Sequence, residues 1–149
     1  MKNLILLFSI SLMLIFGCAK KETVKFPQGA WQLVQTQTIT DGKVDEGFPV
    51  TWSGSLIKMW TEKNWANIGK WKQDTLSGDL YAGGTYTLEG NKYEENILHH
   101  ATKQYEGKIS TNMGLELKND TLILTYHPID TAGVANNSID EIEKYVRIK

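Results

Sequence analysis

The residue types that most often carry catalysis or bind metals are few in this chain, and their spacing limits what they can do. Glu95 and His99 lie four residues apart in a segment that alternates like a β-strand. Residues at that separation on one strand are about 13 Å apart, which is too far for direct proton transfer between them. His99 and His100 point to opposite faces of a strand, so they cannot hold one ion together, and His127 can join only one of them.

Other chemical motifs are missing as well. The sequence contains no catalytic triad in a recognised order, no phosphate-binding loop and no zinc-ligand spacing. Its 16 Lys and Arg residues against 17 Asp and Glu residues give a formal net charge of −1, and no basic patch is dense enough for nucleic-acid binding. We therefore expect a monomeric protein that is not an enzyme and that uses no cofactor, metal or nucleic acid.

The N-terminal segment has the composition of a secretory leader. Lys2 supplies a positive charge, and Leu4–Phe16 is an almost unbroken apolar run. This run is too short to cross the ~30 Å hydrocarbon core of a bilayer, which needs ~20 apolar residues in a helix. Cys18 follows directly after Gly17 and is the only cysteine of the sequence, so no disulfide can form within the chain.

The four residues from Ile15 to Cys18 resemble the lipobox of bacterial lipoproteins, in which the leader is cut before the cysteine. The resemblance implies a leader over residues 1–17 and an acylated Cys18 that begins a polar tether over residues 18–28. Several acyl chains would anchor the protein stably, since each buried CH₂ contributes ~0.8 kcal/mol and one chain alone binds weakly. An ordinary secretory leader that happens to contain a cysteine is the alternative.

Residues 29–149 form one small predicted domain of short strands separated by turns. The first alternating segment ends at Asp41-Gly42, which favours a type I′ hairpin turn. A single helical turn is indicated at Ser138–Glu141. The predicted strands are Gly29–Thr40, Ser55–Thr61, Trp65–Lys72, Gly83–Leu88, Lys92–His100, Lys108–Lys118, Thr121–His127 and Ile142–Ile148.

About eight strands joined in order by tight turns predict an all-β, antiparallel up-and-down barrel. A barrel of this size encloses a lumen just wide enough for side chains or one small ligand. A two-sheet sandwich is the main alternative, although it usually needs long crossing connections.

Three local features resemble those of lipocalins and related calycins. Gly29-Ala30-Trp31 at the head of the first strand matches their Gly-x-Trp signature, and Arg147 stands near the end of the last strand. In that family such an arginine packs over the tryptophan at the closed end of the barrel. Residues 83–93 look like a hairpin of a lipocalin-like family of bacterial lipoproteins of unknown function, whose order of strands fits residues 29–148. The insertion Pro128–Asp140 departs from that pattern.

Alternation assigns faces to the strands, because successive residues point to opposite sides. Lys70 and Lys72 should face water, which turns the residues between and before them inward. The inward rows are Trp31, Leu33, Gln35 and Gln37; Trp65, Asn67, Gly69 and Trp71; Tyr86 and Leu88; Tyr93, Glu95, Ile97 and His99; Ile109, Thr111, Met113, Leu115 and Leu117; and Leu122, Leu124 and Tyr126 with Tyr145. A β-bulge would reverse any of these rows.

The lumen assigned in this way is partly polar, and a solid core would leave such groups unsatisfied at a cost of ~1–3 kcal/mol each. We expect a partly hydrated pocket that holds a small hydrophobic or amphipathic molecule against aromatic rings. The alternative is that the polar residues sit at the open rim and face bulk water. The expected ligand-binding residues are Gln35, Trp65, Asn67, Trp71, Tyr86, Glu95, His99 and Tyr126.

Together these features predict a lipid-anchored protein of the bacterial cell envelope, held in the outer membrane of a Gram-negative cell, that binds a small ligand in its barrel. The alternative is an interaction scaffold whose barrel is filled and whose rim loops contact a protein or glycan partner. The volume of the lumen separates the two, since an open cavity of a few hundred Å³ favours ligand binding.

Overall fold

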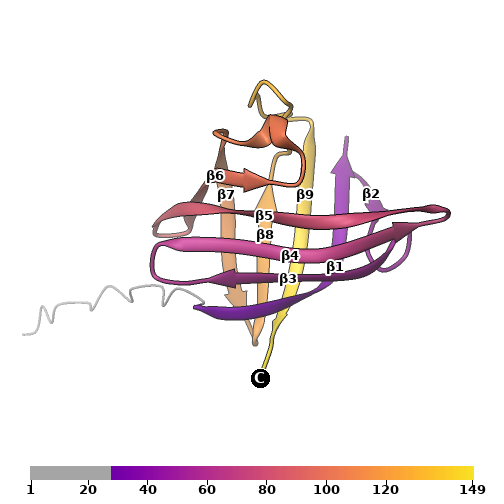
Figure 1. Ribbon diagram of the computed structural model, residues 1–149, viewed down its shortest axis with the longest axis horizontal. Coiled ribbons are helices and arrows are strands. Elements are labelled where there is room, and N and C mark those ends of the chain that lie inside the picture. The colour runs from indigo at the N-terminus through magenta and orange to yellow at the C-terminus, as the bar shows by residue number, and fades with distance from the viewer. Residues whose placement is uncertain (1–27) are drawn as a thin grey trace, which may run out of the picture.

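The computed structural model describes residues 28–149, which form nine strands and one short 3₁₀ turn (Figure 1). The predicted leader, Cys18 and the tether as far as residue 27 lie outside the described residues. The elements are β1 (Gly29–Thr40), β2 (Lys43–Glu46), β3 (Ser53–Trp60), β4 (Asn64–Gln73), β5 (Leu76–Glu89), β6 (Lys92–His100), η2 (Lys103–Tyr105), β7 (Ile109–Lys118), β8 (Thr121–Tyr126) and β9 (Ile139–Arg147).

Eight of the strands in the described part of the chain close into a barrel. β1 pairs with β3 on one side and with β9 on the other, and β3 to β9 pair in sequence order, all antiparallel. The prediction of an all-β, eight-stranded up-and-down barrel with lipocalin-like architecture is therefore confirmed. β2 is an additional strand that pairs with the last residues of β1, from Gln37 to Thr40.

The barrel strands lie in two layers that cross at a steep angle (Figure 1). β3, β4 and β5 run across the front of the view, whereas β7, β8 and β9 run behind them. β1 belongs to both layers, since its first residues pair with β3 and the rest of the strand runs beside β9. Because β1 closes the circle, neither layer is left with a long unpaired edge.

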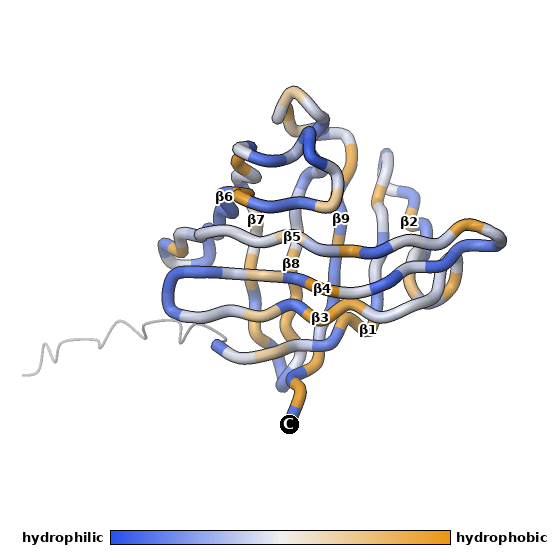
Figure 2. The backbone as a smooth tube through the Cα atoms, viewed as in Figure 1, coloured by the Kyte–Doolittle hydropathy of each residue, from blue (hydrophilic) through white to orange (hydrophobic). Residues whose placement is uncertain are grey.

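The first hairpin forms as the sequence predicts. Asp41 and Gly42 both have positive φ, at 52° and 76°, which is what a type I′ turn between two strands requires. Along the strands, hydropathy changes from residue to residue, as expected when one face is buried and the other is wet (Figure 2). The side-chain pattern and the turn chemistry thus favour the same register.

Two strands begin at least three residues earlier than predicted, and the other predicted boundaries differ from the observed ones by at most two residues. β5 begins at Leu76 rather than Gly83, because the polar residues from Ser77 to Asp79 pair with β4 in one long hairpin. β9 begins at Ile139, so the helical turn expected over Ser138–Glu141 is wrong. Both β1 and β8 offer backbone partners to this segment, and a strand between them satisfies more backbone groups than one helical turn can.

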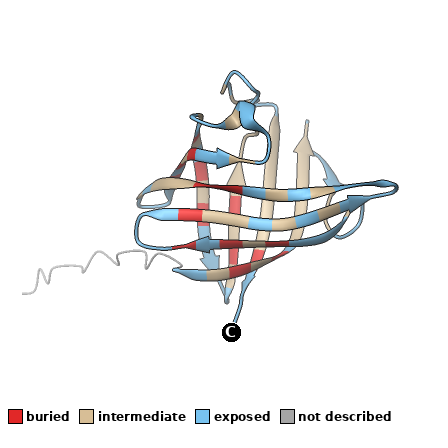
Figure 3. Cartoon of the chain, in the orientation of Figure 1, coloured by how far each residue is buried: buried red, intermediate tan, exposed pale blue. Residues whose placement is uncertain are grey.

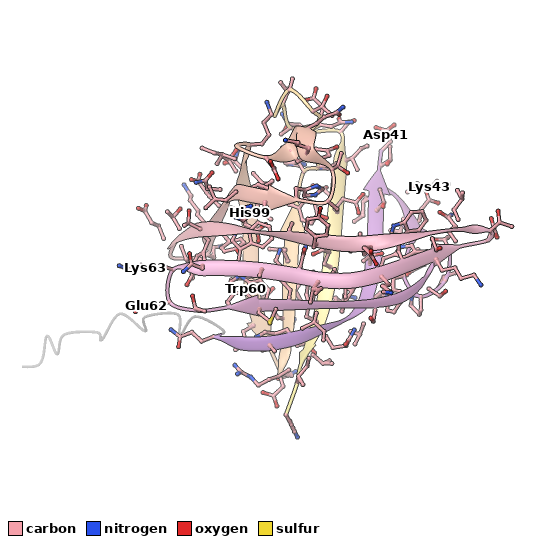
Figure 4. The ribbon with its side chains drawn as sticks, in the orientation of Figure 1. Asp41, Lys43, Trp60, Glu62, Lys63 and His99 are labelled. Atoms are coloured by element: carbon pink, nitrogen blue, oxygen red, sulfur yellow. The ribbon has the colours of Figure 1, made fainter. Side chains whose placement is uncertain are left out.

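Aromatic side chains fill one end of the lumen. Trp60, which is labelled in Figure 4, donates a hydrogen bond through Nε1 to the Tyr93 hydroxyl at 2.7 Å, and its ring meets the Tyr145 ring edge-on at 6.2 Å. Trp31, Tyr93 and Tyr145 are fully buried, and Figure 3 shows buried residues on strands of both layers. We call this part of the lumen, lined by Trp31, Trp60, Tyr93 and Tyr145, the closed half.

Arg147 covers Trp31 at the outside of the closed half, as the resemblance to calycins implies. The two residues are directly paired between β1 and β9, and Arg147 Cζ lies 4.5 Å from the centre of the Trp31 ring. Arg147 also donates a hydrogen bond to the carbonyl of Gln28 at 2.9 Å. Gly29 has φ of +123°, and a Cβ there would lie only 3.0 Å from the guanidinium, so glycine suits this position on two counts.

No helix within residues 28–149 is long and apolar enough to span a bilayer.

Candidate functional site

The other part of the lumen, which we call the cavity half, is open. It contains a cavity of about 330 Å³ and an adjoining one of about 290 Å³. Five lining residues are common to both, so the two cavities meet there: Asn67, Ala82, His100, Tyr126 and Glu143. A volume of this size lies at the lower end of the usual range for small-molecule sites.

β3, β6 and β9 each run from the closed half to the cavity half. On each strand, one step of two residues along the inward face leads from an aromatic residue to a charged one. On β3 the step leads from Trp60 to Lys58, on β6 from Tyr93 to Glu95, and on β9 from Tyr145 to Glu143. Because residues two apart share a face, each charged side chain lies beside the ring of its own strand. We call Lys58, Glu95 and Glu143 the charged layer; it lies between the filled aromatic end and the open space.

Lys58 and Glu95 form a buried ion pair at the floor of the larger cavity. Lys58 Nζ lies 2.7 Å from Glu95 Oε1, and the two side chains are 5% and 6% exposed. The Tyr93 hydroxyl donates to the same Oε1 at 2.7 Å while it accepts from Trp60. Burial, followed by the charge of Glu95, raises the pKa of Tyr93, so this phenol keeps its proton and continues to donate.

Aromatic rings surround the ammonium of Lys58. Its Nζ lies 4.8 Å from the centre of the Trp65 ring and 5.4 Å from that of Trp60. Such cation–π contacts, together with the carboxylate, offset the loss of hydration that a buried ammonium suffers. Lys58 was not among the residues predicted to face the lumen, although alternation with the buried Leu56 and Trp60 on β3 could have placed it inward.

Glu143 receives its hydrogen bonds from two phenols. Tyr126 donates to Oε1 at 3.0 Å, and Tyr145 donates to Oε2. Burial is the main cause that raises the pKa of both tyrosines, and the charge of Glu143 adds to it. Both hydroxyls therefore remain protonated donors, and they fix the orientation of the carboxylate.

In the described part of the chain, Asn67 Oδ1 is the one buried side-chain nitrogen or oxygen atom that has no hydrogen-bond partner. This oxygen is shielded from solvent and accepts no hydrogen bond from any described residue. Buried side-chain oxygens in folded proteins nearly always have a donor, and an exception calls for a partner supplied from elsewhere. Asn67 lines both cavities, so a molecule in the lumen could supply that donor.

Two segments border the mouth of the larger cavity. His100 ends β6 and Tyr105 lies in the β6–β7 connection, with ring centres 4.9 Å apart, and Pro128 and Ile129 come from the β8–β9 connection. Lys108 Nζ joins the two connections through a hydrogen bond to the carbonyl of Ala132 at 3.3 Å. The mouth is thus bounded by segments that are tied to each other.

The β8–β9 connection has local structure of its own. Asp130 Oδ1 accepts from the backbone amides of Ala132 and Val134, at 2.8 and 2.9 Å. The bond from Val134 is the main cause that lowers the pKa of Asp130. Ile129 pairs with Ala135 in an isolated bridge. The insertion that departs from the lipocalin pattern therefore forms an ordered turn above the cavity.

Four of the eight residues expected at the ligand site do line the lumen: Trp65, Asn67, Glu95 and Tyr126. Met113 and Leu115 of the next inward row are buried as expected, and so are Leu122, Leu124 and Tyr145. The other four expected residues lie elsewhere, and bulges account for two of them.

His99 points away from the lumen, contrary to the prediction. Gly83 and Gly84 of β5 pair with His99 and Ile97, so Leu98 is an extra residue in β6. Leu98 and His99 are both exposed, and His100 takes the inward position that His99 was expected to hold (Figure 4). The alternation of inward and outward residues gives no sign of an inserted residue, so His99 was predicted to face inward in place of His100.

Gln35 and Gln37 likewise lie outside the lumen. Leu33 pairs with Tyr145 but Gln35 pairs with Lys144, which makes Val34 an extra residue in β1. Both glutamines donate hydrogen bonds to Glu46 on β2, at 3.1 and 2.7 Å. These bonds, that of Gln37 foremost, lower the pKa of Glu46. Gln35, which was expected to contact a ligand, thus contacts the additional strand β2 instead.

A third bulge reverses the first half of the β7 row. Tyr93 pairs with Met113 and Glu95 with Ser110, so two residues of β7 face Glu94. One of them, Asn112, has a left-handed backbone with φ of 57°. Ile109 is consequently 53% exposed, and Ser110 lines the cavity in place of the expected Thr111.

Trp71 and Tyr86, contrary to the prediction, line neither cavity. Trp71 lies farther along β4 than Asn67, where its indole nitrogen would be 2.7 Å from a Cβ at Gly78. The Tyr86 hydroxyl donates to the carbonyls of Thr61 and Glu62 in the β3–β4 turn, at 2.8 and 2.6 Å. Neither residue therefore contributes to the lining of the pocket.

The described residues contain no cluster of three or more His, Cys, Asp or Glu side chains that could hold a metal ion. The cavity lining instead combines hydrogen-bonding and charged groups with apolar groups, among them Ile97, Met113, Leu124 and Ile129. This arrangement can bind and orient an amphipathic molecule. No family model matches the chain, and no curated protein matches it either.

Proposed function

We propose that this protein binds a small amphipathic molecule inside its barrel. The observation that carries the proposal is the cavity of about 330 Å³ between the charged layer and the mouth. Core packing of the density usual in proteins leaves few voids larger than a water molecule, so an interaction scaffold has no use for such a space. The mixed lining, with Asn67 Oδ1 lacking a donor, supports a ligand that has both a polar and an apolar part.

The test is to fill the lumen at the point where the two cavities meet. Ala82 is buried and lines both cavities, so Ala82→Phe places a ring in the open space. Thr87→Phe is the matched control, since Thr87 is an exposed residue of the same strand. The probe is N-phenylnaphthylamine, a neutral amphipathic dye whose fluorescence rises in apolar surroundings.

We expect the native protein and Thr87→Phe to bind the dye equally, and Ala82→Phe to bind it at least about tenfold more weakly, a difference of about 1.4 kcal/mol. Thermal melting confirms that each variant is folded. Equal binding by Ala82→Phe would place the dye outside the lumen, and absence of binding to the native protein would leave the filled-scaffold function in its place.

We further propose that Cys18 carries the lipid that holds the barrel at the cell envelope, with the barrel acting as a monomer on a short tether. The support is the apolar run followed by Gly17-Cys18. Cys18→Ser should release the domain from the membrane fraction or leave the leader uncleaved, as seen by fractionation and intact mass. Normal processing with unchanged membrane attachment would exclude lipidation at this residue.

A further inference from the structure

The charges around the lumen do not balance. Among the described residues that line the larger cavity, two carboxylates, Glu95 and Glu143, stand against one ammonium, Lys58. The pair of Lys58 with Glu95 is neutral in itself. Glu143 belongs to no ion pair in the described part of the chain, and its partners are the neutral phenols of Tyr126 and Tyr145.

Glu143 has room for further donors. Each carboxylate oxygen can accept two hydrogen bonds, and each oxygen of Glu143 receives one from a tyrosine. The tyrosines hold the carboxylate in place without neutralising its charge. A cation in the lumen would therefore find a fixed anionic partner with open acceptor positions.

Asn67, on β4 in the opposite layer of the barrel, is a second residue of the lumen with an acceptor that lacks a donor. Its shielded Oδ1 has no donor among the described residues. Asn67 and Glu143 both line both cavities, so the residue that carries the orphaned oxygen and the residue with the unpaired carboxylate meet where the cavities join. One group with several N–H donors at that place would satisfy both of them.

We infer, building on the proposed function, that the ligand is an amphipathic amine. Its ammonium donates to Asn67 Oδ1 and to the Glu143 carboxylate, and its apolar body lies against Trp65, Met113 and Leu124. A carboxylate ligand would face the charge of Glu143 and would leave Asn67 Oδ1 without a donor. A neutral alcohol can donate one hydrogen bond but does not neutralise the carboxylate.

The experiment compares three probes with the same apolar body: naphthylethylamine, naphthylethanol and naphthylacetate. Binding to native protein, stripped of co-purified molecules by unfolding and refolding, is measured by titration calorimetry at neutral pH. We expect the amine to bind about tenfold more tightly than the alcohol, and naphthylacetate to bind most weakly.

Two variants locate the head group. Glu143→Gln keeps an oxygen acceptor for a tyrosine and removes the charge, so the amine should lose its advantage over the alcohol. Asn67→Leu should weaken the amine several-fold without harming the fold, because it removes an unsatisfied buried oxygen. The matched control is Glu141→Gln, on the same strand but lining neither cavity, which should keep the native preference.

The outcomes separate this inference from the proposed function. Tightest binding of naphthylacetate would place the head group at Lys58 and overturn the inference while ligand binding stands. Equal affinity for amine and alcohol, or a preference that survives Glu143→Gln and Asn67→Leu, would do the same. If neither these probes nor N-phenylnaphthylamine bind, the proposed function itself fails.

Discussion

The closed half and the cavity half are made from the same strands, yet one is filled by rings and the other is left open. β3, β6 and β9 each supply an aromatic residue to the first and a charged residue to the second, two positions apart. The hydroxyls of Tyr93 and Tyr145 bond to Glu95 and Glu143, and the Trp60 ring lies near the Lys58 ammonium. The aromatic end therefore not only closes the barrel but also stabilises the charges that border the cavity.

The two halves should respond differently to loss of volume. Trp31→Ala removes a fully buried ring from the closed half and should lower the free energy of unfolding by ~3–5 kcal/mol. Ile129→Ala, at the mouth of the cavity, should lower it by less than ~1 kcal/mol, because that side chain already borders open space. Urea denaturation of both variants measures the difference. Equal losses at the two positions would show that the halves are not packed differently.

Within the charged layer, Lys58 and Glu95 should each destabilise the fold when the other is removed. Lys58→Met leaves Glu95 buried without its cation and should cost about 3 kcal/mol, the low end of the range for broken buried ion pairs because the cavity admits water. Lys58→Met combined with Glu95→Gln keeps an acceptor for Tyr93 and should recover most of that loss. The comparison is made by urea denaturation as a double-mutant cycle. A double variant whose loss equals the sum of the single losses would contradict the coupling.

The smallest effect is expected farther toward the rim, at Glu141, the next step along β9 after Glu143. Burial raises the pKa of Glu141 above its ordinary value of 4.5, the Thr38 hydroxyl lowers it, and Glu143 raises it. Between the unfolded and the raised folded pKa, the native state binds more protons, so stability falls as the pH rises through that interval. Glu141→Gln cannot ionise, so its stability relative to the native protein should rise over the same interval and then level off.

Urea denaturation from mildly acidic to neutral pH measures this trend. The control is Glu94→Gln, which makes the same substitution at an exposed carboxylate on β6. A stability difference between Glu141→Gln and the native protein that is constant with pH would show that Glu141 titrates as it does in the unfolded chain.

The sequence predicts the barrel, its antiparallel order and its closed end, since turn residues and alternation act locally along each strand. Trp31 and Arg147 were found because both belong to a recognisable pattern. The cavity was predicted only in part, because three inserted residues reverse the facing of β1, β6 and β7 partway along. A bulge depends on the partner strand as well as on its own, so His100 and Ser110 could not be placed from alternation alone.

The burial of charged side chains was the second reason why the cavity could be predicted only in part from the sequence. Lysine is almost never fully buried without a partner, so the inward position that alternation gives Lys58 becomes convincing only when Glu95 and the rings of Trp60 and Trp65 are known to surround it. Glu143 is similar, since its two tyrosines come from β8 and β9 and meet only when these strands pair. Residues that need several partners from distant segments become visible only in the folded chain.

The extra residue Leu98 has a consequence for how the gene can change. Ile97 and His100 face the lumen on either side of the two outward residues Leu98 and His99. Loss of the Leu98 codon would restore plain alternation and still leave Ile97 and His100 on the lumen side. A single-codon deletion usually turns the remainder of a strand inside out. In β6 it would leave the binding surface intact, so this strand can vary in length among descendants of the gene without a change in what the barrel holds.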